Sequence, residues 1–124
     1  MGVLHVERRC PPSPLVPDDP WCVWISHDAS FPWRLRDSAP GDRVALPRAA
    51  GRQKVSRILM DKKVPRGQRA AWPLLEIEGI IAWVIGLRRG EVARPREDAT
   101  EAWFCRFDAR GASQRNLIDR FVLK

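Results

Sequence analysis

The sequence lacks the long apolar runs and cysteine patterns that mark several common classes of protein. Its longest uncharged apolar run is Gly79–Leu87, far shorter than the ~20 residues of a membrane-spanning helix. No apolar segment with a basic start opens the chain, so a secretory signal is not expected. The three cysteines form no C-x-x-C pair and are odd in number, which favours a reducing compartment over a disulfide scaffold. These absences indicate a small cytoplasmic domain with no membrane partner.

Motifs of catalysis and metal binding are missing as well. The sequence contains no G-x-x-x-x-G-K-[ST], G-x-G-x-x-G, G-x-S-x-G or H-E-x-x-H. The two histidines, His5 and His27, combine with Cys10 and Cys22 at spacings that match no common zinc motif. We therefore expect no metal, no cofactor and no catalytic residue in this chain.

Positive charge is what the sequence has in excess, and the charge is concentrated. The chain carries 22 basic and 15 acidic residues among 124, a net charge of +7. Trp33–Trp72 holds eleven basic and three acidic residues, a net charge of +8, so the rest of the chain sums to −1. A surface charged only for solubility does not predict this concentration, whereas a polyanion partner does, most often a nucleic acid. Charge alone leaves open a solvated basic face without a partner, and an acidic lipid or protein as the partner.

Length and residue patterns predict one domain behind a proline-rich linker. A chain of 124 residues is of single-domain size. Cys10–Pro20 contains five prolines and separates an N-terminal segment, residues 1–20, from a domain over residues 21–124. Aromatic and β-branched residues predict strands over Val3–Arg9, Trp21–Ser26, Trp33–Arg36, Arg43–Leu46, Leu74–Ile77, Ile80–Leu87 and Ala102–Phe107.

One amphipathic helix is predicted over Arg52–Lys63. Its inner face recurs at helical spacing and comprises Val55, Ile58, Leu59 and Lys62, the last through its aliphatic stem. Lys54 and Arg57 fall on a separate face by the same periodicity. Two shorter helices and a tight basic turn are also predicted, over Arg66–Ala71, Ser113–Leu123 and Leu87–Arg89.

The basic segment and the strands after it carry an ordered set of short motifs. These are Pro40-Gly41-Asp42-Arg43, Gln53–Arg66, Arg69, Trp72-Pro73-Leu74-Leu75 and Ile81–Arg88. In this order they form a G-D-R turn, a lysine-containing helix, a V-P junction and two apolar strands that end in G-x-R. Together they resemble the C-terminal domain of tRNA(Ile)-lysidine synthetase over roughly Trp24–Pro95.

The resemblance implies an α+β, sandwich-like domain of short strands with one main amphipathic helix, similar also to a domain of the phenylalanyl-tRNA synthetase β subunit. In that family the domain grips the tRNA acceptor stem during wobble-cytidine modification, and a separate catalytic domain or chain uses ATP to attach lysine. The S-G-G-x-D-S loop of that catalytic domain is absent here, so we do not expect ligase activity from this chain alone. A structural or protein-interaction remnant without RNA binding, or one subunit of a split ligase, stay open as alternatives.

Candidate RNA-binding residues follow from the basic segment together with the resemblance. An A-form stem is recognised mainly through its shape and its phosphates, so exposed cations are the groups of interest. Along the strand predicted at Trp33–Arg36, alternation places Arg34 and Arg36 outward together. The candidates are Arg43, Lys54, Arg57, Lys63 and Arg66, followed by Arg34 and Arg36.

Overall fold

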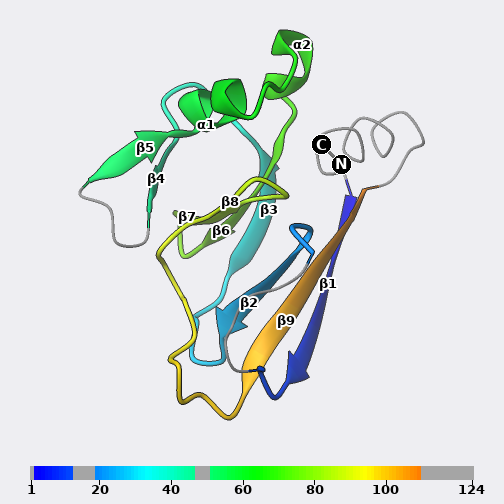
Figure 1. Ribbon diagram of the computed structural model, residues 1–124, viewed down its shortest axis with the longest axis vertical. Coiled ribbons are helices and arrows are strands. Elements are labelled where there is room, and N and C mark those ends of the chain that lie inside the picture. The colour runs from blue at the N-terminus through cyan, green and yellow to red at the C-terminus, as the bar shows by residue number, and fades with distance from the viewer. Residues whose placement is uncertain (1, 13–18, 47–50, 110–124) are drawn as a thin grey trace.

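A computed structural model describes residues 2–12, 19–46 and 51–109 of the chain (Figure 1). The strands in this part are β1 (Gly2–Arg9), β2 (Cys22–Ser26), β3 (Trp33–Asp37), β4 (Arg43–Ala45), β5 (Arg52–Lys54), β6 (Pro73–Ile77), β7 (Ile80–Val84), β8 (Arg88–Arg89) and β9 (Ala102–Ala109). The helices are α1 (Val55–Asp61) and α2 (Arg66–Arg69). The expected α+β class is confirmed, and so is each of the seven predicted strands, although β7 ends at Val84 rather than Leu87. Neither helix in these ranges is long and apolar enough to span a bilayer.

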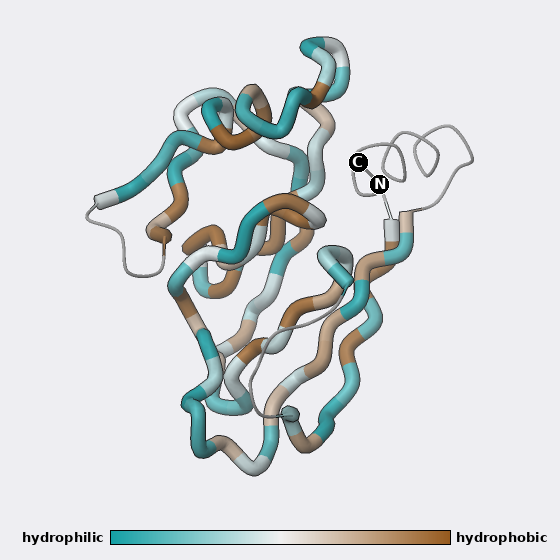
Figure 2. Tube along the Cα trace, viewed as in Figure 1, coloured by the Kyte–Doolittle hydropathy of each residue, from teal (hydrophilic) through white to brown (hydrophobic). Residues whose placement is uncertain are grey.

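The strands form two larger antiparallel sheets and one two-stranded ribbon. The first sheet has the order β1-β9-β2, the second has the order β3-β6-β7-β8, and β4 pairs with β5. One hydrophobic core joins them: it includes Ile25 and Cys105 of the first sheet, Leu75 of the second, and Leu59 of α1. Figure 2 shows the hydrophobic segments along β6 and β7 and the hydrophilic ones along β5. The ribbon and the helices therefore cover one end of the second sheet and keep a polar outer side.

The central hairpin β6–β7 is apolar because both of its faces are covered. Leu75 pairs with Trp83 and Leu74 pairs with Val84, and all four side chains are buried although the two pairs lie on opposite faces. The connection is a two-residue turn in which Glu78 and Gly79 both have positive φ, of 53° and 79°. This is the turn geometry that matches the twist of paired strands.

The N-terminal strand is part of the first sheet. β1 pairs with β9 along its whole length, from Gly2 opposite Ala109 to Arg9 opposite Ala102. The sequence prediction placed residues 1–20 outside the domain, yet in the structure β1 lies beside a strand a hundred residues later. No pattern within the segment indicates this pairing, because the residues of Val3–Arg9 would suit an isolated extended strand equally well.

Two local predictions were wrong in their bounds. Helix α1 begins at Val55, not Arg52, because residues 52–54 pair with β4 as strand β5, and Lys54 has extended backbone angles. The basic turn predicted at Leu87–Arg89 lies two residues earlier, over residues 85–87, and Arg88–Arg89 form strand β8, in which Arg89 pairs with Trp83 of β7. The helix predicted over Ser113–Leu123 lies outside the described residues.

Gly86 allows the chain to pass beneath the Trp21 ring after β7. Its φ is +79°, and a Cβ added there would lie 2.3 Å from atoms of that ring. We expect Gly86→Ala to lower the free energy of unfolding by about 2–4 kcal/mol, the sum of left-handed backbone strain and overpacking. Gly79→Ala is the matched control, since Gly79 has the same φ and open space around it, and it should lose only about 1 kcal/mol. Equal losses for both variants in urea denaturation would contradict this account.

Candidate nucleic-acid interface

The β4–β5 ribbon presents three cations on one face. Arg43 lies directly opposite Lys54, and Ala45 lies opposite Arg52. Because cross-strand partners share a face and neighbours along a strand alternate, the three basic side chains project to one side while Val44 is buried on the other. Arg52 was not among the residues predicted from the sequence. The alternation of basic and neutral residues in Arg52-Gln53-Lys54 indicates a strand with both cations on one face. The helix predicted over the same residues hid this pattern.

The charges on this ribbon are not neutralised. Within the described ranges, no carboxylate forms an ion pair with Arg43, Arg52 or Lys54. Like charges directly opposite each other in an antiparallel pair destabilise it by a few tenths of a kcal/mol up to about 1 kcal/mol. The fold therefore tolerates an unfavourable pair at a position where one acidic residue would be favourable. Such an arrangement suits an anionic ligand.

Helix α1 continues this basic surface directly from β5. Arg57 is exposed on its first turn and lies 3.4 Å from Asp61 one turn later, with side chains 68% and 56% exposed. Exposed pairs of this kind contribute little, so the guanidinium is free to exchange Asp61 for a phosphate. The buried face of α1 is made of Val55, Ile58 and Leu59, as the periodicity predicted, whereas Lys62 is exposed.

Lys63 ends α1 in a conformation that lysine seldom adopts. Its φ is +61°, its N–H donates to the Met60 carbonyl, and the Val64 N–H donates to the Leu59 carbonyl. These two bonds, with Val64 buried near Leu59, form a Schellman motif, in which the left-handed position is usually glycine. A lysine there costs about 1 kcal/mol relative to glycine. The exposed side chain thus stands at a strained position between the two helices.

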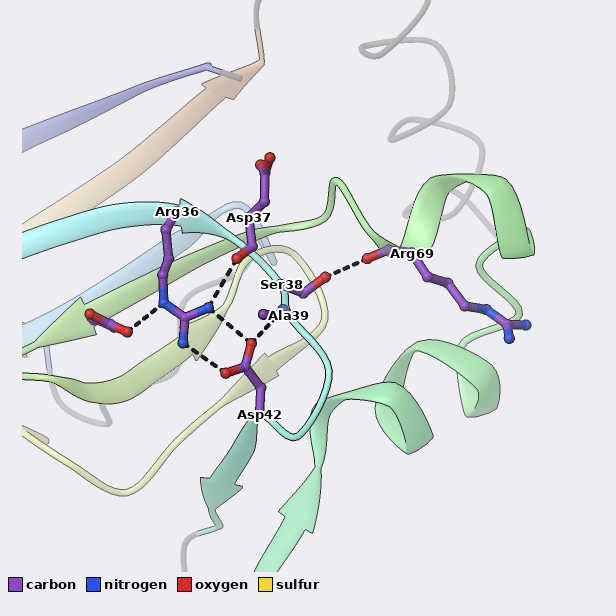
Figure 3. Close-up of polar contacts among 7 residues, drawn as sticks. Arg36, Asp37, Ser38, Ala39, Asp42 and Arg69 are labelled. Atoms are coloured by element: carbon purple, nitrogen blue, oxygen red, sulfur yellow. Dashed lines mark hydrogen bonds and ion pairs between the residues drawn. The ribbon is translucent and has the colours of Figure 1, made fainter.

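Arg36 is half-buried, and carboxylates of the same protein occupy its guanidinium, so it does not belong with the exposed cations. Its guanidinium donates two hydrogen bonds to Asp42, at 2.9 and 2.8 Å, and a further one to the Glu76 carboxylate (Figure 3). The bond from Arg36 holds the pKa of Asp42 below its ordinary value, so this carboxylate is ionised at neutral pH. Alternation correctly places Arg34 and Arg36 on the same face of β3, but only Arg34 is exposed.

The remaining candidates extend the surface beyond α1. Arg66 is exposed at the start of α2, immediately after the Val64-Pro65 junction. Arg34 is exposed on β3, where it lies opposite Glu76. The structure therefore brings Arg43, Lys54 and Arg57 together on the ribbon and α1, sets Lys63 and Arg66 at the α1–α2 junction, and leaves Arg34 on the second sheet.

Comparison with known proteins assigns the chain to a family. Residues 33–103 match the model of the TilS substrate C-terminal domain. The chain belongs to this family. The matched range contains all the exposed cations discussed above, whereas β1 and β2 lie before it.

Individual relatives agree with the TilS family assignment. The chain is 47% identical over 94 residues to the tRNA(Ile)-lysidine synthase of Geobacter sulfurreducens, covering 75% of this chain and 20% of that protein. It is 36% identical over 99 residues to the same enzyme of Symbiobacterium thermophilum, covering 77% and 20%. The chain thus spans about a fifth of the length of these relatives. A crystal structure of a TilS C-terminal domain has a TM-score of 0.72 at 26% identity, covering 88% of this chain and 85% of that chain.

Lys63 offers a way to separate the loss of a surface cation from a loss of stability in this TilS-family domain. We expect Lys63→Gly to raise the free energy of unfolding by about 0.5–1 kcal/mol, because glycine adopts the left-handed conformation without strain. The same change removes one cation from the candidate surface, so a tRNA bound there should bind about threefold more weakly, close to the loss of a single phosphate contact. Urea denaturation and tRNA titration measure the two effects. A variant that is more stable and binds tRNA as tightly as the parent would exclude Lys63 from the surface.

Proposed function

We propose that this TilS-family domain binds tRNA through the exposed cations of the β4–β5 ribbon, α1 and the α1–α2 junction, in tRNA wobble-cytidine modification. The relatives at 47% and 36% identity are tRNA(Ile)-lysidine synthases, so tRNA is the polyanion that suits a surface of this charge. We assign RNA binding to these residues and not the ATP-dependent ligation step, for which the sequence carries no motif.

The observation that carries this proposal is the pairing of Arg43 with Lys54. Two cations lie directly opposite each other on an exposed ribbon, with no carboxylate paired to either within the described ranges. Electrostatic repulsion between them disappears when a phosphate lies across both side chains. Solubility alone does not require two cations to lie opposite each other, so it does not account for this unfavourable pair.

The geometry suits double-stranded RNA, of which the acceptor stem is the proposed target. In an A-form helix the bases are hard to reach through the deep major groove, so a small domain recognises phosphates, 2′-hydroxyls and overall shape. Arg43 and Arg57 can each make bidentate contacts with a phosphate, whereas Lys54 and Lys63 act as point charges. Trp24 is buried, so it offers no platform on which an unpaired base could stack.

The test is tRNA binding by a variant with fewer surface cations. We expect Lys54→Ala plus Arg57→Ala to bind a tRNA(Ile) transcript about tenfold more weakly at low salt, and to reduce the slope of log affinity against log salt by about two. Arg94→Ala plus Arg96→Ala is the matched control. It removes the same charge from the exposed β8–β9 connection, which lies at the other end of the molecule from α1 and α2 (Figure 1).

The control decides between specific and general electrostatics. If both double variants lose the same affinity, binding depends on net charge alone and the proposed surface is wrong. If the parent protein does not bind tRNA at low salt, the alternative of a structural or protein-interaction module replaces this proposal.

A further inference from the structure

We propose that Asp42 is a positioning residue for the tRNA-binding surface, holding Arg43 and Lys54 in register without contacting RNA itself. This inference rests on the proposed function of that surface. It follows from hydrogen bonds made by two different parts of Asp42, three through the carboxylate and one through the main-chain carbonyl.

The carboxylate of Asp42 fixes the β3–β4 turn to the second sheet. One oxygen accepts a hydrogen bond from the Ala39 N–H at 2.7 Å, which closes the turn. Both oxygens accept from the Arg36 guanidinium, and the same guanidinium is bound to Glu76 on β6 (Figure 3). A bidentate arginine–carboxylate pair sets the orientation of both groups as well as their distance.

The main-chain carbonyl of Asp42 fixes the far side of the ribbon. It accepts the Val55 N–H at 2.9 Å. Asp42 immediately precedes Arg43, and Val55 immediately follows Lys54, so this bond closes the end of the ribbon at the one position where two cations face each other. Without a fixed Asp42 the repulsion between Arg43 and Lys54 is free to separate the strands.

The same turn also holds the α1–α2 junction. The Ser38 hydroxyl donates to the Arg69 carbonyl (Figure 3). The Ser38 N–H donates to the Trp72 carbonyl at 2.8 Å. The Arg69 side chain in turn donates to the Val64 carbonyl at 2.9 Å, next to Lys63. Both halves of the basic surface are therefore attached to one turn, which sets their mutual spacing.

Asp42 acts on RNA only through these neighbours. Its side chain is 13% exposed and that of Arg36 is 19% exposed, and a carboxylate repels phosphate in any case. Removal of an acidic group next to a tRNA-binding surface should strengthen binding by simple electrostatics. The positioning role predicts the opposite sign, and this difference is what the experiment measures.

The experiment compares tRNA binding by the parent chain, Asp42→Asn, Lys54→Ala and the double variant. We expect folded Asp42→Asn to bind tRNA five- to tenfold more weakly, with a shallower salt dependence, although its net charge is one unit more positive. Lys54→Ala should weaken binding less in the Asp42→Asn background than in the parent, because Lys54 is no longer held in register. Gly86→Ala, destabilised at a distant site, is the control and should bind tRNA like the parent when folded.

Each other outcome has a definite meaning. Unchanged or tighter binding by folded Asp42→Asn overturns the positioning role and leaves the tRNA-binding proposal intact. Failure of the parent to bind tRNA overturns both. If Asp42→Asn does not fold, Arg36→Lys replaces it, because lysine keeps the charge but cannot make the bidentate bond. A folded Arg36→Lys variant with parental affinity then overturns the inference.

Discussion

Replacing Arg89 by methionine is expected to lower the free energy of unfolding by about 3–5 kcal/mol, the largest loss of any single change considered. Arg89 is half-buried and makes no ion pair within the described ranges. It donates instead to main-chain carbonyls, those of Ala82, Gly90, Val92, Trp24 and Ala93, at 2.8–3.3 Å. Burial lowers the pKa of Arg89 to about 10, so the group is still protonated at neutral pH.

The size of this effect comes from the carbonyls that Arg89 joins. Trp24 belongs to the first sheet and Ala82 to the second, so one side chain connects the two layers of the fold. Methionine fills a similar volume but donates no hydrogen bond, and each buried carbonyl left without its donor costs about 1–3 kcal/mol. Some of that loss is avoided because the Ala82 carbonyl also accepts the Gly90 N–H.

Urea denaturation measures this prediction, with the neighbouring Arg88→Met as the matched control. Arg88 is exposed on the same short strand, so its replacement should change stability by no more than about 0.5 kcal/mol. If Arg89→Met loses less than about 1 kcal/mol, the guanidinium does not join the two sheets in the manner described.

Replacing Lys54 by glutamate is expected to weaken tRNA binding at least about 30-fold while leaving the domain as stable as before or more stable. A glutamate opposite Arg43 converts a repulsive cross-strand pair into an attractive one, worth about 0.2–1 kcal/mol. Its position at the start of α1 is also favourable for a negative charge. The tRNA loses the phosphate contact of Lys54, is repelled by the new carboxylate, and meets an Arg43 whose charge is neutralised by it. The expected 30-fold loss of affinity corresponds to about 2 kcal/mol.

Opposite changes in stability and affinity make this variant informative. Weak binding by a destabilised protein can always be attributed to misfolding, whereas weak binding by a more stable one cannot. Lys54→Arg is the control, since it keeps the cation and should retain affinity within about threefold. Parental affinity in folded Lys54→Glu would exclude the ribbon from the interface.

Local sequence patterns predicted the strands and the buried face of α1, and they failed where distant partners decide. The stripe Val55, Ile58 and Leu59 identified the helix, but its periodicity cannot show that residues 52–54 pair with β4. This pairing joins residues that lie about ten positions apart in the sequence, and it depends on the turn at Asp42. The first turn of the predicted helix is therefore a strand.

The candidate site shows the same division between local and distant information. Charge density in Trp33–Trp72 indicated the basic surface, and alternation correctly put Arg34 and Arg36 on one face of β3. Nothing near Arg36 in the sequence reveals that Glu76, forty residues later, accepts a hydrogen bond from its guanidinium. Arg89 is a second case: two adjacent arginines suggest an exposed turn, and only the packing of two sheets buries one of them.

The most direct test of the account is the salt dependence of tRNA binding by the parent chain. If about five phosphates are neutralised by the ribbon, α1 and the α1–α2 junction, log affinity should fall with log salt at a slope of about −4.5, roughly 0.9 per phosphate. The slope should become shallower by about one unit in Lys54→Ala and stay unchanged in Arg94→Ala. No binding at low salt, or a slope near zero, would contradict the claim that this surface binds the tRNA backbone.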